Sequence, residues 1–174
     1  MRNLLLRLTF ALLAAISVTA QTVGWREYKN LGGNFSVLLP GEPRLSTETQ
    51  GANTIHTVLS LVDSLGYIIL YTKNERDQAP DEASYKSFKE LFLKGNSQCS
   101  VVSEQPAAPV LNGYIGHLYR LHCERFNMNM TLFGNLYTGK HYSYAVMGMF
   151  GTTPTDPPEI KKFVNSFSLV DPIR

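Results

Sequence analysis

Short apolar stretches separated by turn residues fill the first half of the chain and predict β-strands. In the segment TIHTVLSLV the side chains alternate with a period of two, which places successive residues on opposite faces of a sheet. Gly32 and Gly33 separate the first two stretches, and residues 63–66 separate the next two, as turns do. The pattern therefore predicts two strand pairs, with strands at 25–30, 35–39, 54–62 and 67–73.

The segment after residue 80 changes to the helical period. Between residues 85 and 92, apolar and aromatic side chains recur at spacings of three and four and form one face. Asp81 precedes them and can accept hydrogen bonds from the free N–H groups of a first turn. Gly95 follows them, where a left-handed residue commonly ends a helix. The pattern predicts a helix between Asp81 and Gly95.

The same period returns near the C-terminus. Asp156 is predicted to cap this second helix, Pro157 to occupy its first position and Glu159 to complete a capping box. Residues 168–170 predict a short strand after it. The apolar face consists of Ile160, Phe163, Val164 and Phe167, at the spacing i, i+3, i+4 and i+7.

The region between the two predicted helices again has the pattern of strands. One strand is predicted near 98–103 and a long one at 114–124. A hairpin of 128–137 and 141–150 follows, and its two-residue turn is predicted at Gly139–Lys140.

The hairpin is apolar on both faces. Its predicted register places Leu132 opposite Met147 and Tyr137 opposite Tyr142. A strand pair that is apolar on both faces requires cover on both sides. We therefore predict an α+β fold: an α/β/α sandwich with a mainly antiparallel sheet, a helix in the middle of the chain and a helix at its end.

The first twenty residues have the three parts of a secretory signal peptide. Arg2 and Arg7 form the positive region, residues 8–18 form the apolar run, and the small residues 18–20 form a cleavage site before Gln21. The run is shorter than the roughly 20 apolar residues that span a bilayer. We predict an exported protein, periplasmic or extracellular, with no membrane span in the mature chain.

The predicted cleavage changes the charge. Removing the two signal arginines from the 16 Lys and Arg residues leaves 14, which equals the 14 Asp and Glu residues. A neutral mature chain lacks the basic patch of a nucleic-acid-binding protein. Residues 21–174 have the length of a single domain with one core.

The chain contains two cysteines, Cys99 and Cys123. In an oxidising compartment such a pair commonly forms a disulfide, which the sequence predicts here. Two separate buried thiols are the alternative, because spacing alone does not show that the two β-carbons face each other.

Three tyrosines of the hairpin, Tyr137, Tyr142 and Tyr144, share one predicted face. Tyrosine combines apolar area with a polar tip, which suits a recognition surface. The alternative interpretation is that a helix covers this face, so that the rings belong to the core and only the hydroxyls reach its edge.

The sequence has no catalytic or metal-binding motif. It lacks the nucleophile elbow, the Gly-rich phosphate loop and the zinc-protease helix motif. His117 and His122 lie five residues apart on one predicted strand and therefore point to opposite faces. We predict no catalytic residues, no metal site and no cofactor.

Four segments resemble PsbP-like domains: FSVLLPGEP, GYIGHLYRLHC, HYSYAVMGMF and IKKFVNSFSLV. They extend over nearly the whole mature chain, from Asn34 to Val170. The resemblance implies an α/β/α sandwich that acts by binding, and it supplies no catalytic motif. A plain secretory signal, in place of a transit peptide, argues against a photosystem role.

The leading functional hypothesis is an exported, non-catalytic binding or assembly module whose partner is another envelope or extracellular protein. A second hypothesis is a carrier of a small apolar ligand held between sheet and helix, which requires a sizeable apolar pocket. A third is an enzyme of an unrecognised type, which requires polar groups with perturbed pKa values that converge in a cleft.

Overall fold

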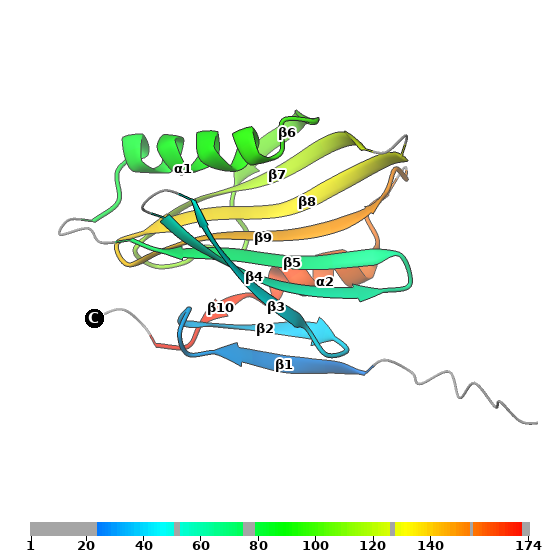
Figure 1. Cartoon of the computed structure of the whole chain (residues 1–174), viewed down its shortest axis with the longest axis horizontal. Coiled ribbons are helices and arrows are strands. Elements are labelled where there is room, and N and C mark those ends of the chain that lie inside the picture. The colour runs from blue at the N-terminus through cyan, green and yellow to red at the C-terminus, as the bar shows by residue number, and fades with distance from the viewer. Residues whose placement is uncertain (1–23, 51–52, 75–78, 126–127, 154, 172–174) are drawn as a thin grey trace, which may run out of the picture.

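The computed structural model describes residues 24–50, 53–74, 79–125, 128–153 and 155–171, and the predicted signal peptide lies outside these ranges. Within them the chain forms ten strands and two helices (Figure 1). The elements are β1 (Trp25–Asn30), β2 (Phe35–Pro40), β3 (Arg44–Gln50), β4 (Asn53–Val62), β5 (Leu65–Lys73), α1 (Glu82–Gly95), β6 (Cys99–Pro106), β7 (Tyr114–Arg125), β8 (Met128–Gly139), β9 (Tyr142–Gly151), α2 (Pro158–Asn165) and β10 (Ser168–Leu169).

The strands form two antiparallel sheets. Seven strands make the main sheet in the order β3-β4-β5-β9-β8-β7-β6, and three make a small sheet in the order β1-β2-β10. In the main sheet, β3, β4 and β5 pair in succession, and so do β6, β7, β8 and β9. The pairing of β5 with β9 joins these two halves.

The predicted α/β/α sandwich was wrong. The chain is mainly β, and its strands divide between two antiparallel sheets instead of forming one sheet between two helical layers. The prediction placed every strand in a single sheet. The pattern of apolar positions does not show that β1, β2 and β10 form a sheet of their own, with β2 in the middle.

The predicted register of the β8–β9 hairpin was also wrong, by two residues. Tyr137 pairs with Tyr144, and Leu132 pairs with Met149. The last paired residues are Thr138 and Ser143, so the connection is longer than the predicted two-residue turn. A shift of two residues leaves every side chain on its predicted face.

The helix ends agree with the sequence only in part. Asp81 caps α1 as predicted, because its side chain accepts a hydrogen bond from the Ser84 amide at 2.8 Å. Gly95 is still helical, and the cap that follows it is Asn96, which is not left-handed. Asp156 does not cap α2; its carboxylate pairs with Arg120.

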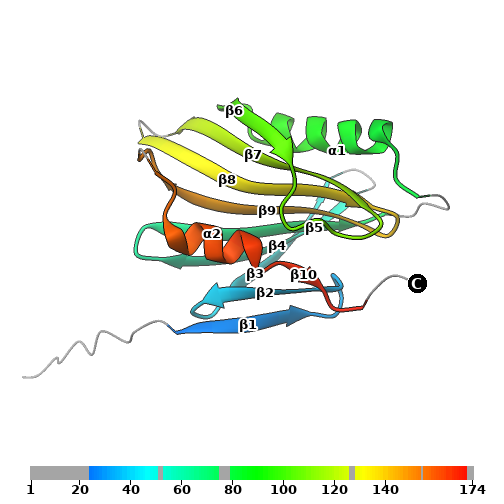
Figure 2. The ribbon, with the colours of Figure 1, turned by 180° about the vertical axis from the view of Figure 1, so that it is seen from behind.

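One face of the main sheet is closed over its central strands. α2 contacts strands β9, β5 and β8 of this sheet, and it also contacts β2 of the small sheet (Figure 2). The approach is close enough that a β-carbon added at Gly148 would lie 2.2 Å from Ile160. The core on this side includes the fully buried residues Phe35, Ile69, Val146 and Phe163.

The other face is covered only in part. α1 lies over β7 and β8, and Tyr85 and Phe92 anchor it there (Figure 1). In the described part of the chain no other helix continues this cover over β4 and β5. The same face of those strands therefore keeps partly exposed apolar residues, among them Leu59, Ile68 and Leu70.

The helices have 14 and 8 residues. Among the described residues, no helix has both the length and the apolar character that a membrane crossing requires.

Candidate functional site

A groove of about 520 Å³ lies where α1 stops covering the main sheet. Its volume and its mainly apolar lining are within the range of small-molecule sites in proteins. The side chains and backbone that line it come from α1 and from strands β3, β4, β5 and β9: Glu48, Asn53, Ile55, Thr57, Leu70, Tyr71, Thr72, Phe88, Leu91, Phe92, Lys94, Gly95, Asn96 and Ala145.

Three strands form the floor of the groove. Ile55 and Thr57 of β4 pair with Thr72 and Leu70 of β5, and Leu70 pairs in turn with Ala145 of β9. Paired residues of antiparallel strands project to the same face, so these side chains form one continuous surface. Among these paired residues, only the two threonine hydroxyls are polar, and Asn53 of β4 adds an amide.

α1 forms one wall. Phe88, Leu91 and Phe92 follow the helical spacing that predicted this helix, and all three line the groove. Phe92 is buried against the sheet, Phe88 is half-buried, and Leu91 is 39% exposed. One apolar stripe thus both attaches the helix and faces the groove.

Polar residues stand at the rim. Glu48 of β3 and Lys94 in the last turn of α1 are the charged lining residues. Lys94 forms no ion pair with any other residue in the described ranges. The side-chain amide of Asn96 donates a hydrogen bond to the Phe92 carbonyl at 2.8 Å and so already has a partner within the helix end.

A second hollow, of about 260 Å³, lies at the C-terminal end of α1. It shares two lining residues with the groove, Gly95 and Asn96. Its remaining lining residues are Ile68, Ser97, Gln98, Cys99, Cys123, Met130, Leu132 and Met149, none of which is charged.

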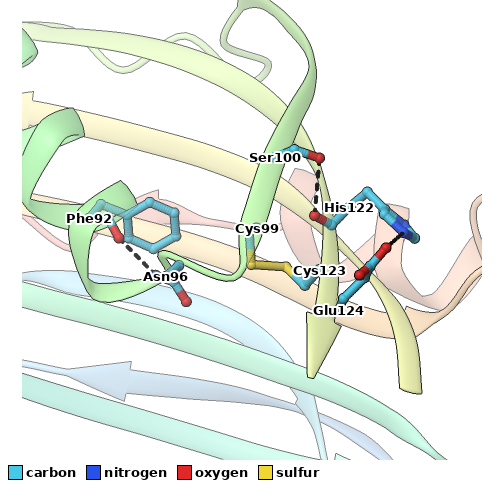
Figure 3. Close-up of a disulfide and its surroundings, with 7 residues drawn as sticks. All are labelled: Phe92, Asn96, Cys99, Ser100, His122, Cys123 and Glu124. Atoms are coloured by element: carbon cyan, nitrogen blue, oxygen red, sulfur yellow. Dashed lines mark hydrogen bonds and ion pairs between the residues drawn. A yellow bond between two sulfur atoms is a disulfide. The ribbon is translucent and has the colours of Figure 1, made fainter. Parts of the chain in front are cut away.

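The predicted disulfide is confirmed. Cys99 of β6 and Cys123 of β7 are directly paired residues, and they form a disulfide that lines the second hollow. Figure 3 shows it next to the end of α1. The Cys99 amide donates to the Asn96 carbonyl at 2.8 Å, so the disulfide holds the segment that ends the groove wall.

The N-terminal half of α1 is held by a polar network. The Tyr85 hydroxyl donates to Tyr119 at 2.9 Å, and the Tyr119 hydroxyl donates to Glu104. Lys89 lies 2.7 Å from the other oxygen of that carboxylate, and His117 Nδ1 lies 3.0 Å from the first. One carboxylate of β6 therefore joins α1 to β7.

Three members of this network, Glu104, Tyr85 and Tyr119, have shifted pKa values. Burial by itself would raise the pKa of Glu104, but hydrogen bonds from Lys89 and Tyr119, with the nearby charges of Lys89 and His117, hold it below its ordinary value. Burial raises the pKa of the Tyr85 and Tyr119 phenols. Glu104 is therefore ionised and the phenols neutral at physiological pH, which keeps the network intact.

The three tyrosines singled out in the sequence lie on the closed face. Tyr137 and Tyr144 are buried, and Tyr142 is half-buried. Each hydroxyl donates to a backbone carbonyl of a connecting segment: Tyr137 to Pro109, Tyr142 to Gly32 and Tyr144 to Gly33. These tyrosines pack the core and fix two loops, and the groove lies on the opposite face.

The histidines do not come together. His117 faces α1, and His122 lies on the opposite face of β7, as their spacing predicts. His56 stacks on Tyr71 with ring centroids 4.7 Å apart. In the ranges that the structure describes, no three His, Cys, Asp or Glu side chains converge on a point where a metal ion could bind.

No local pattern in the sequence indicates the groove. Its floor residues on β4 show the alternation of an ordinary strand, and its wall residues on α1 show the stripe of an ordinary core helix. The groove exists because α1 lies over β7 and β8 and leaves β4 and β5 open, which depends on strand order.

Comparison with known proteins does not identify the chain. No protein-family model matches it, and no curated protein matches it. The PsbP-like resemblance stays a prediction.

Proposed function

We propose that this protein binds a small, mainly apolar molecule in the groove between α1 and the main sheet, outside the cytoplasm. The observation that carries the proposal is a concave site of about 520 Å³ whose floor and wall are mainly apolar. Ligand sites have this character: an apolar enclosure with a few polar groups that fix orientation. The disulfide supports an oxidising compartment, which agrees with the predicted export signal.

Exposed apolar surface in the groove favours a ligand energetically. Removing apolar area from water contributes about 25 cal/mol per Å². The partly exposed side chains of Ile55, Leu70 and Leu91 leave such area unburied in the free protein. An apolar molecule in the groove would bury it without any change of fold.

Of the two hypotheses, the structure favours a ligand carrier, which needs a groove, over an assembly module that would dock a partner through the three tyrosines. The residues that contribute most to binding at protein interfaces are enriched in exposed Trp, Tyr and Arg side chains. Tyr137 and Tyr144 are 1% and 0% exposed, so they offer almost no area to a partner. Binding to another envelope protein stays a prediction that would need a different surface.

Titration with the apolar dye N-phenylnaphthylamine tests the proposal, because its fluorescence rises in an apolar site. We expect saturable binding to the mature protein with one dye per chain. Thr57→Trp places a large ring on the groove floor and is expected to weaken dye binding at least about tenfold, a change of 1.4 kcal/mol in binding free energy.

Thr54→Trp is the matched control. Thr54 is an exposed residue of the same strand on the opposite face, outside the groove. It should leave the affinity unchanged, and near-UV circular dichroism should show that both variants stay folded. Equal dye binding by wild type and a folded Thr57→Trp variant would contradict the proposal.

A further inference from the structure

We propose that the ligand is chain-shaped: an amphiphile whose apolar tail runs from the groove past Gly95 into the hollow beside the disulfide. This inference rests on the proposed function and adds the class of ligand. Its first support is continuity, because Gly95 and Asn96 line both spaces.

The two spaces follow one line along the sheet. On β5, Thr72 and Leu70 line the groove, and Ile68, the next residue on the same face, lines the second hollow. On β9, Ala145 lines the groove and Met149 lines the hollow. From Thr72 to Ile68 the strand rises about 13 Å, which suits an extended chain better than a compact ring system.

Charged side chains line only one of the two spaces. The charged lining residues, Glu48 and Lys94, stand at the groove rim, and the second hollow has none. Its lining includes Ile68, Leu132 and two methionines, Met130 and Met149, together with the polar residues Ser97 and Gln98. Methionine adapts its shape to flexible apolar chains. A ligand with a charged head beside Glu48 and Lys94 and an apolar tail toward the disulfide matches this placement of charge.

Gly95 has no side chain that could separate the groove from the second hollow. A β-carbon added there would meet no other atom within 4 Å, so the position opens on free space. Because Gly95 lines both spaces, a large side chain at this position would stand at the boundary between them.

A chain-length comparison tests the inference. Each CH₂ group buried in the second hollow adds to the affinity, so we expect wild type to bind hexadecanoate at least about tenfold more tightly than octanoate in dye-displacement titrations. Gly95→Trp should abolish this preference by weakening hexadecanoate binding alone. Ile68→Trp, which fills the hollow itself, should do the same and serves as a second variant if Gly95→Trp does not fold.

Gly24→Trp is the control, since Gly24 also opens on free space and lies before β1, away from α1. It should keep the wild-type preference. If octanoate and hexadecanoate bind equally to wild type, or if the preference persists in both blocked variants, the inference is wrong while the groove proposal stands. If neither fatty acid nor the dye binds wild type, the groove proposal itself fails.

Discussion

The two faces of the seven-stranded sheet differ in how completely they are covered. Ile69 and Leu70 are neighbours on β5 and point to opposite faces. Ile69 is fully buried beneath the small sheet and α2, whereas Leu70 is partly exposed in the groove. The closed face therefore contributes more to the stability of the fold, and the half-open face carries the proposed ligand site.

The difference arises from what each helix covers. α2 and the three-stranded sheet both pack on the same face of the main sheet and share one core with it. α1 acts alone, over β7 and β8, and is attached by Phe92, by the Glu104 network and by the disulfide at its end. A single helix is too narrow to cover seven strands, because its diameter with side chains is about 10–12 Å and neighbouring strands lie about 4.8 Å apart.

The largest expected effect is on the closed face. Phe163 of α2 is fully buried, and its ring meets Tyr67 edge to face with centroids 5.4 Å apart. Phe163→Ala is expected to lower the free energy of unfolding by about 3–5 kcal/mol, measured by urea denaturation. Leu91→Ala in the groove wall should cost less than about 1 kcal/mol, because Leu91 is exposed. Similar losses for the two variants would contradict the distinction between the faces.

The next effect is at the disulfide. Cys99 and Cys123 are separated by 24 residues in sequence, and closing a loop of this length stabilises the fold by about 3 kcal/mol on the chain-entropy model. The double variant Cys99→Ser with Cys123→Ser should lose about that amount in urea denaturation.

Thiol counting in denaturant gives the control. The untreated wild-type protein should show no reactive thiol, and the reduced protein should show both. Two thiols before reduction would mean that the cysteines are unpaired and that the end of α1 is held by other contacts.

The smallest effect is at the Glu104 network. The folded protein holds the pKa of Glu104 below its ordinary value of 4.5, so the unfolded chain takes up its proton at higher pH. The resulting stabilisation is complete above pH 4.5 and is lost as the pH falls through the folded-state pKa. The free energy of unfolding should therefore decrease less with falling pH in Glu104→Gln than in wild type. The difference should be at most about 1 kcal/mol, as expected for a partly exposed ion pair.

Glu124→Gln is the matched control for this prediction. Glu124 is 80% exposed and its carboxylate lies 3.9 Å from His122, outside the α1 network. In urea denaturations repeated over a series of pH values, Glu124→Gln should show the same decrease in the free energy of unfolding at acid pH as wild type. If Glu104→Gln and wild type show the same pH dependence of the free energy of unfolding at acid pH, Glu104 contributes no stability through its ionised form.

The sequence predicted most elements but not their assembly. The strands at 25–30 and 54–62 and the capped start of α1 could be found from periodicity and capping, because these depend on neighbouring residues. β3 was not predicted, since RLSTETQ is an exposed edge strand without apolar alternation. The separate small sheet and the open half of the α1 face depend on long-range pairing, which local patterns do not contain.

The candidate site follows the same division. The apolar stripe of α1 was visible, but that Leu91 would face a groove and Phe92 the core depends on where the helix rests. The role of Glu104 could not be predicted from the sequence either. It contacts Tyr119 because β6 pairs with β7, and it contacts Lys89 because α1 packs on β7.

Methyl NMR during titration with N-phenylnaphthylamine tests the central claim most directly, because the two faces report separately. We predict saturable shifts in the methyl signals of Ile55, Leu70 and Leu91 in the groove and none in Ile69 and Val146 on the closed face. Shifts in Ile69 and Val146, or saturable binding that leaves the Leu70 methyl signals unmoved, would contradict the account.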